Sequence, residues 1–286
     1  MRWDRARRSR NVEDRRGASS SGKSKLGAGV LLLVIVLSVL FDKHPLEVLG
    51  VLQPERAETS QTQPDSAAAD ADPRVDFVRA ILGDTEDVWS ALFAKASGRY
   101  EAPRLVLFDG HVDSACGGAT AATGPFYCPG DRQVYLDLSF FDELRNKLGG
   151  GGDFAQAYVI AHEVGHHVQT LLGIADEIQT ARQNKPAALR GAGGLLVRQE
   201  LQADCFAGVW AYHAQQRHQW LDAQDIETAL NTAAAIGDDR LQTQSRGYVM
   251  PESFTHGSSA QRVHWFQIGF KRGEIENCDT FSADPL

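Results

Sequence analysis

The segment VIAHEVGHHVQ, residues 159–169, constrains this chain more than any other feature, because it spaces two histidines four residues apart around a glutamate. On a helix, positions four apart lie on one face, so the side chains of His162 and His166 meet at one place. Two imidazoles in this arrangement are ligands for one tetrahedral zinc ion. Glu163 projects beside such an ion and is placed to take a proton from zinc-bound water. We therefore expect a helix near residues 154–172 that carries one Zn²⁺ ion.

A third protein ligand is expected from the segment QELQADCFA, residues 199–207. Glu200 and Asp204 are again four apart, on the small-residue face of a second expected helix. Two acids on such a face are costly to bury unless a cation compensates them. We assign Glu200 to the zinc ion, and Asp204 to a hydrogen bond that fixes the tautomer of a ligand imidazole. The alternative is a solvent-facing acidic pair. His167 lies about 100° around its helix from His166, so we expect it to be structural.

The charge distribution separates the start of the chain from the rest. The chain has 286 residues and a net charge of -8, but its first 25 residues contain nine Arg or Lys and three acids. The remainder is therefore strongly acidic, which argues against nucleic acid as the main partner. A domain of about 200 residues buries its own core, so a metal is expected to serve chemistry rather than folding.

The domain organisation follows from an uncharged apolar run, LGAGVLLLVIVLSVLF, at residues 26–41. Basic residues precede it, which is the positive-inside pattern of a transmembrane anchor. We expect a basic cytoplasmic head (1–25), a transmembrane anchor (26–41), a flexible linker (42–74) and a metal-binding domain (75–286). The domain would then lie outside the inner or cytoplasmic membrane, in the periplasm or extracellular space. The alternatives are a cleaved signal peptide, although no A-x-A site follows the run, and a buried core helix.

Helices are expected to dominate the domain. Helical spacing is present over Val75–Lys95, interrupted near Gly83, and helices are also expected near residues 154–172, 194–216, 222–236 and 258–272. Strand candidates are residues 104–108 and 133–141, the second following a Pro-Gly turn. These patterns predict an α+β fold, mainly helical with a small sheet, preceded by one transmembrane helix.

The motifs HEVGH and ELQAD are similar to the gluzincin pattern, HExxH followed by ExxAD. More closely, the chain resembles the bacterial "putative neutral zinc metallopeptidase" family over nearly its whole length except the linker. The resemblance is carried by MRWDRARRSRNVEDRRG, GPFYCPGDRQVYLDLSFF, AHEVGHHVQ, RQELQADCFAGVWA, THGSSAQRVHWFQIGF and ENCDTF. It implies a zincin-like domain that binds zinc and hydrolyses peptide bonds, and it leaves the substrate open.

Two further assignments follow from the resemblance. In gluzincins an edge strand of the sheet pairs with extended substrate, and residues 133–141 are the candidate here; the alternative is an ordinary core strand. His256 corresponds to a histidine that stabilises the oxyanion in related membrane gluzincins. The alternative for His256 is a residue at a helix entry with Ser258 or Ser259 as N-cap. Tyr127 and Tyr135 are further oxyanion candidates, and the sequence does not select among them.

The four cysteines are an even number in a part of the chain expected outside the cytoplasm, where disulfides form. Of three connectivities, we expect Cys116–Cys128, which closes the loop before the second strand, and Cys205–Cys278, which ties the tail to the ligand helix. The alternative is four buried thiols.

These observations predict a membrane-anchored zinc metallopeptidase whose partners are a peptide or protein substrate and a membrane. The alternative is a zinc-containing envelope binding protein or scaffold with little turnover, in which a fourth protein ligand would replace water at the zinc. A zinc-dependent hydrolase of an ester or cell-wall amide is the third hypothesis. The sequence does not specify the oligomeric state.

Overall fold

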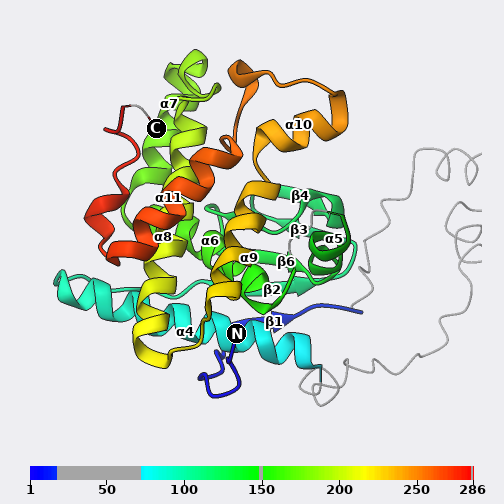
Figure 1. Cartoon of the computed structure of the whole chain (residues 1–286), viewed down its shortest axis with the longest axis vertical. Coiled ribbons are helices and arrows are strands. Elements are labelled where there is room, and N and C mark those ends of the chain that lie inside the picture. The colour runs from blue at the N-terminus through cyan, green and yellow to red at the C-terminus, as the bar shows by residue number, and fades with distance from the viewer. Residues whose placement is uncertain (18–71, 148–150, 285) are drawn as a thin grey trace, which may run out of the picture. The chain divides into compact units, whose positions relative to one another are not determined.

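The computed structural model describes residues 1–17, 72–147, 151–284 and 286. All of these except Gly17 belong to one compact unit, bounded as Met1–Arg16 and Asp70–Leu286. Helices predominate in it, and a small sheet accompanies them, as the sequence patterns predicted (Figure 1). The helices are α4 (Pro73–Lys95), α5 (Ser139–Lys147), α6 (Asp153–Leu171), α7 (Ile174–Asn184), α8 (Leu195–His218), α9 (Ala223–Ala235), α10 (Asp238–Arg246) and α11 (Ser259–Arg272).

The main sheet has four strands in the order β1-β2-β6-β5. They are β1 (Val12–Asp14), β2 (Arg104–Phe108), β6 (Gln133–Asp137) and β5 (Phe126–Cys128), and only the β5–β6 pair is antiparallel. Strands β3 (His111–Ser114) and β4 (Gly117–Thr120) form a separate hairpin. Of the two interpretations of residues 133–141, the edge strand is wrong and the core strand is confirmed, because β6 has β2 on one side and β5 on the other. Strand β6 also ends at Asp137, and helix α5 begins at Ser139.

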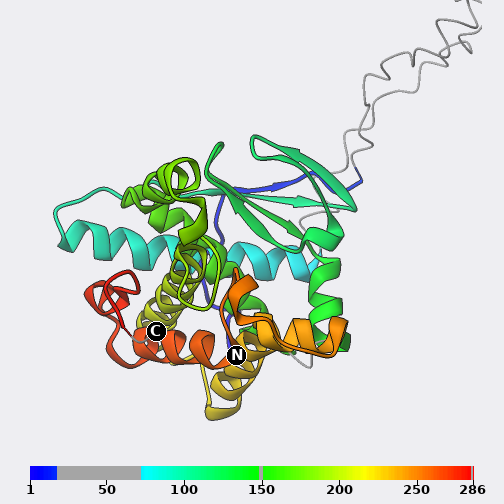
Figure 2. The same cartoon turned by 90° about the horizontal axis from the view of Figure 1, so that it is seen from above.

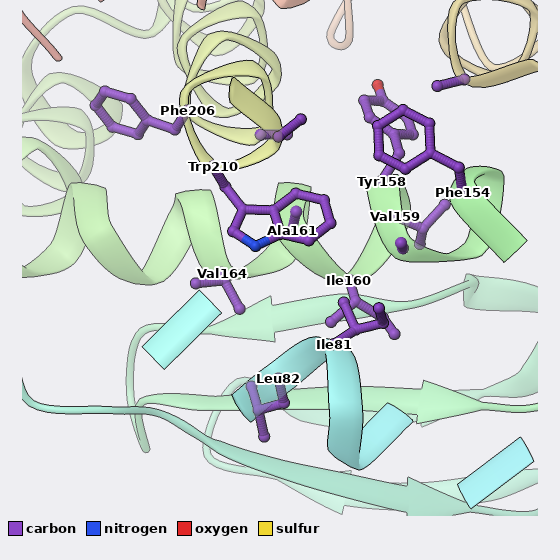
Figure 3. Packing of buried hydrophobic residues seen from close by; sticks show 14 of the residues in the cluster. Ile81, Leu82, Phe154, Tyr158, Val159, Ile160, Ala161, Val164, Phe206 and Trp210 are labelled. Carbon is purple, nitrogen blue, oxygen red and sulfur yellow. The ribbon is translucent and has the colours of Figure 1, made fainter. Parts of the chain in front are cut away.

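The core lies between the sheet and the helices, with α6 at its centre. Figure 3 shows α6 passing between α8 and the strands, with Val164 and Ile160 on its sheet side and Trp210 of α8 packed against it. Ile81 and Leu82 of α4 belong to the same buried cluster (Figure 3). Burial on both sides fixes the rotation of α6, and this rotation determines where its polar residues point.

Glycine allows the closest helix contacts. A Cβ on Gly165 of α6 would lie 3.0 Å from the carbonyl oxygen of Ala203, so α6 and α8 approach each other closely at this point. On its other side α8 packs against α11, where a side chain on Gly208 or Gly269 would overlap the partner helix's backbone. Figures 1 and 2 show α8 and α11 side by side. Helix α8 is therefore held from both sides next to Asp204, one turn after Glu200.

Both expected disulfides are present. Cys116 is bonded to Cys128, which ties the β3–β4 hairpin to β5. Cys205 is bonded to Cys278, which ties the carboxy-terminal segment to α8. The cysteines are therefore not the four thiols of the alternative interpretation, and no free cysteine occurs in the described part of the chain.

The first sixteen residues are part of the compact unit. Their strand β1 pairs in parallel with β2, and Ser9 donates its backbone N–H to the carbonyl of Arg79 in α4 at 2.9 Å. The ring of Trp3 packs edge-on against Phe77, with the ring centroids 5.2 Å apart. Two of the basic residues form ion pairs with α4, Arg7 to Glu86 at 2.7 Å and Arg8 to Asp76 at 2.6 Å.

These contacts correct the expected localisation. A single-pass topology would separate the amino-terminal residues from the domain by a membrane, whereas residues 1–16 pack directly on α4 and β2. Within the described ranges, none of the helices has the length and apolarity that crossing a membrane requires. The expected transmembrane helix and the single-pass membrane localisation are therefore not supported. The apolar run at 26–41 itself lies outside the described residues.

Helix α4 also differs from expectation. It begins at Pro73, with Asp72 as N-cap, and continues without a break through Gly83. A Cβ on Gly83 would overlap the carbonyl oxygen of Arg7. The glycine therefore marks a close approach of the amino-terminal segment rather than a helix end.

Candidate metal centre and active site

Helices α6 and α8 bring the three expected ligands together. The Nε2 atom of His162 lies 3.2 Å from Oε2 of Glu200, and Nε2 of His166 lies 3.4 Å from Oε1 of the same carboxylate. One ligand atom from each of the three residues falls within 4.8 Å of the others. All three side chains are largely buried, with 8%, 14% and 18% of the side-chain surface exposed for His162, His166 and Glu200.

The chemistry of this donor set fits a zinc ion. Two imidazoles and one carboxylate form a three-ligand set typical of catalytic zinc, which leaves a fourth position for water or substrate. Burial lowers the pKa of His162, but the neighbouring charge of Asp204 and hydrogen bonds to Asp204 and Glu200 outweigh it and raise the pKa to about 10. The surrounding carboxylates thus favour positive charge where the ligand atoms meet, as a cation site requires.

Asp204 orients the His162 ring through Nδ1, the nitrogen that faces away from the ligand cluster. It lies one turn after Glu200 on α8, is fully buried, and has Oδ1 2.9 Å from Nδ1 of His162. A neutral His162 ring that donates from Nδ1 has its Nε2 lone pair free for the metal. The same carboxylate accepts hydrogen bonds from the Tyr158 hydroxyl and from Arg262 of α11. Burial favours the neutral acid, but the charges of Arg262 and His162 prevail and lower the pKa of Asp204 to about 2.

Gln169 performs the corresponding task for His166. Its Oε1 lies 2.8 Å from Nδ1 of His166, and its amide nitrogen donates to the carbonyl of Gln199 and to Oε1 of Gln202 in α8. Because the carbonyl oxygen of Gln169 accepts only, Nδ1 of His166 carries the proton and Nε2 faces the ligand cluster. Each ligand imidazole is therefore oriented by a partner on its outer side.

Glu163 lies beside the cluster and lines a cavity of about 550 Å³. Its side chain is largely buried, with 8% of the residue exposed. The cavity is bounded on one side by Phe126 and Tyr127 of the edge strand β5. His256 lines it from the loop before α11. The edge strand next to the cluster is therefore β5 and not β6.

His256 is held by a loop around Asp238. One carboxylate oxygen of Asp238 accepts the backbone N–H groups of Thr255, His256 and Gly257, at 2.7, 2.6 and 3.1 Å. Its other oxygen lies 3.3 Å from Nδ1 of His256, and this hydrogen bond raises the pKa of the imidazole. Oγ1 of Thr255 lies 2.9 Å from the same nitrogen, so Asp238 and Thr255 both engage Nδ1, and Nε2 is the other polar atom of the ring. Of the two N-cap candidates, Ser258 caps α11.

The two tyrosines considered for oxyanion binding have other partners. The Tyr135 hydroxyl donates to Asp131 at 2.8 Å. The Tyr127 hydroxyl lies 3.1 Å from Nδ1 of His167, whose Nε2 is 2.6 Å from the carbonyl of Glu101. His167 must donate to that carbonyl from Nε2, and burial lowers the pKa of its ring, so its Nδ1 accepts the Tyr127 proton. His167 takes no part in the metal cluster.

Sequence reasoning missed Tyr158, Gln169, Arg262 and Asp238. A helical signal existed for two of them. Tyr158 precedes His162 by one turn, and Gln169 follows His166 by three residues, so both lie near the ligand face. Arg262 and Asp238 come from segments far away in sequence, and no local pattern connects them with α6.

Comparison with known proteins identifies the family of this chain. The model of a family described as "Putative neutral zinc metallopeptidase" matches residues 1–281. The chain belongs to this family. It is 47% identical over 291 residues to the "Uncharacterized protein YpfJ" of Escherichia coli K12, with 98% of this chain and 99% of that protein covered. It is 45% identical over 229 residues to the "Uncharacterized protein Rv2575" of Mycobacterium tuberculosis, covering 76% of this chain and 74% of that protein. No solved structure matches.

Proposed function

We propose that this chain hydrolyses peptide bonds with one zinc ion held by His162, His166 and Glu200, and with Glu163 as general base. The observation that carries the proposal is the convergence of the three ligand atoms within 4.8 Å, beside Glu163 and an open cavity. When bound there, zinc supplies Lewis-acid chemistry, which lowers the pKa of a water molecule and polarises a carbonyl group.

The residues of the chain perform the remaining steps. Glu163 removes a proton from the attacking water and passes it to the leaving amine. His256 donates a hydrogen bond from Nε2 to the oxygen on which negative charge develops. This donor is present in the imidazolium form, which the hydrogen bond from Nδ1 to Asp238 favours, whereas the hydroxyl protons of Tyr127 and Tyr135 serve other bonds.

Strand β5 positions the substrate. It is an edge strand whose residues line the cavity, so an extended peptide pairs with it through main-chain hydrogen bonds. This mode of binding favours a peptide over an ester or a cell-wall amide, because only a peptide offers a matching ladder of donors and acceptors.

The number of protein ligands at the site favours a catalytic zinc ion over the alternative of a non-catalytic zinc protein. A structural zinc site is closed by four protein ligands. Among the residues that the structure describes, the cluster contains three His, Cys, Asp or Glu side chains, and Glu163 lies next to it. This supports an open, catalytic site.

The test uses the full chain with zinc measured by atomic emission and activity followed on an unfolded, dye-quenched protein substrate. We expect about one zinc per chain. Glu163→Gln should keep the zinc and the folded state and lower kcat by about 10²–10⁴-fold, the range for a general base. Glu177→Gln, on the exposed surface of α7, is the matched control and should be fully active. Equal turnover by wild type and Glu163→Gln would refute the assignment of Glu163.

A further inference from the structure

Arg182 is the one charged side chain lining the cavity for which neither a role at the metal site nor a bonding partner has been described. The cavity is lined by five charged or titratable residues outside tyrosine and the two histidine ligands: Glu163, Arg182, Glu200, His256 and Arg262. Glu163 and Glu200 belong to the metal site, Arg262 is paired with Asp204, and His256 is bonded to Asp238. Arg182 is exposed, and within the described residues it has neither an ion-pair nor a hydrogen-bond partner.

The position of Arg182 follows from the path of α6 into α7. His162, Glu163, His166 and Thr170 line the cavity in order along α6, and Ala175 of α7 lines it next. Ala175 and Arg182 are seven residues apart, two helical turns, so they share the face of α7 that is directed at the cavity. The guanidinium therefore lies on the side of the metal site where α6 ends.

The charge of Arg182 and its surroundings in the cavity suit the binding of a carboxylate group. Away from the metal ion, a substrate carboxylate entering the cavity meets the negative charge of Glu163, and the chain as a whole carries a net charge of -8. The walls nearby are largely apolar, with Pro125, Phe126 and Phe140 on the sheet side and Leu241 on the α10 side. A guanidinium binds a carboxylate with two parallel hydrogen bonds, and its charge is permanent.

We propose that Arg182 binds a carboxylate of the bound peptide, so that peptides with an acidic group on the α7 side of the scissile bond are preferred substrates. This inference rests on the proposed peptidase function. The carboxylate comes either from an Asp or Glu side chain or from the carboxy terminus of the peptide, and both present the same planar group to the arginine.

The test compares matched fluorogenic decapeptides on the zinc-loaded full chain. In one series a single Glu is exchanged for Gln at each of three positions on either side of the cleaved bond. In a second series the carboxy terminus is either a free acid or an amide. For the wild type we expect kcat/KM to favour the acidic peptide by about two- to fivefold at positions on one side only, the size of an exposed ion pair.

Variants distinguish a specific effect of Arg182 on the acid preference from a general effect of positive charge on this surface. Arg182→Gln should abolish the preference for acid, and Arg182→Glu should reverse it. Lys185→Gln removes an exposed positive charge three residues away that does not line the cavity, and it should leave the preference intact. If Arg182→Gln changes the preference only in the second series, the group that Arg182 binds is the terminal carboxylate.

Failure of this inference is distinguishable from failure of the proposed function. If the wild type cleaves peptides and Arg182→Gln keeps the same acid preference, the inference is wrong and the peptidase remains. If no peptide is cleaved, the proposed function fails. The same labelled peptides then report binding by fluorescence anisotropy, and an equal Glu-to-Gln affinity ratio in wild type and Arg182→Gln would overturn the inference independently.

Discussion

Arg262 and Asp204 form a two-bond ion pair that is almost completely buried behind the metal-binding helix. The Nε atom of Arg262 lies 2.8 Å from Oδ2 of Asp204, and Nη2 lies 2.9 Å from Oδ1. The exposed fraction is 3% for the arginine side chain and 0% for the aspartate side chain. Asp204 in turn orients His162, so this pair connects α11 to the metal site through α8.

Replacing Arg262 by Met should therefore affect both stability and metal binding. The substitution leaves Asp204 charged and buried with less compensation, which we expect to cost about 3–5 kcal/mol in the free energy of unfolding. Loss of an outer partner of a metal ligand typically lowers metal affinity by about 10–100-fold. Urea unfolding measures the effect on stability, and competition with a zinc chelator measures the effect on metal affinity.

Arg240→Met, at an exposed position of α10, is the control. Unchanged zinc affinity in Arg262→Met would mean that Asp204 holds His162 without help.

A second prediction concerns pH and the place where the amino-terminal segment meets α4. Arg16 is 2.7 Å from Asp14 and 2.7 Å from Asp72, the N-cap of α4, and all three side chains are less than one-fifth exposed. Burial raises the pKa of both carboxyl groups, but hydrogen bonds from Arg16 outweigh it and leave both pKa values below their ordinary value.

A lowered folded-state pKa means that these contacts stabilise the fold above about pH 4, and that the stabilisation is lost as the pH falls through the folded-state values. Arg16→Gln should thus reduce the free energy of unfolding by about 1–2 kcal/mol at pH 7, and by progressively less below pH 4. Urea unfolding of the zinc-free protein in chelator, at a series of pH values, separates this effect from metal loss. Arg10→Gln, at an exposed position, should show no such dependence. A deficit that stays constant down to pH 2 would exclude the two carboxylates as its origin.

Short-range periodicity explains what could be predicted from the sequence. His162 and His166, and likewise Glu200 and Asp204, are related by one helical turn, so their shared faces follow from helix geometry alone. The predicted disulfide pairing is also confirmed, since four cysteines allow only three pairings.

The features that the sequence did not yield depend on long-range pairing. Strand order cannot be read from a single strand, so the sequence leaves open whether residues 133–141 form an edge strand or a core strand; in the structure the three-residue β5 is the edge strand at the cavity. Strand β1 is only VED, too short and polar for a strand pattern, and its partner β2 is about 90 residues away. The basic amino-terminal residues fit the pattern of a topogenic signal in the sequence, whereas in the structure Arg7 and Arg8 serve as ion-pair partners of α4.

The close approach at Gly83 gives the most direct test of the packing of the amino-terminal segment on α4. Alanine in a helix interior is normally favoured over glycine by about 1 kcal/mol, so Gly83→Ala would stabilise α4 if nothing touched it. In this fold the added methyl group would overlap the carbonyl of Arg7 and lie 3.0 Å from the backbone nitrogen of Ser9. We therefore expect Gly83→Ala to lower the free energy of unfolding by about 1–3 kcal/mol, as overpacking does.

Limited proteolysis should also cut the first sixteen residues of Gly83→Ala faster than those of the wild type. Ser90→Ala, on the exposed side of the same helix, reports the propensity effect alone and should be neutral or slightly stabilising. The sign of the Gly83 effect is decisive, because the intrinsic preference and the packing contact act in opposite directions. A Gly83→Ala protein as stable as Ser90→Ala, with an unchanged cleavage rate, would place the amino-terminal segment away from α4.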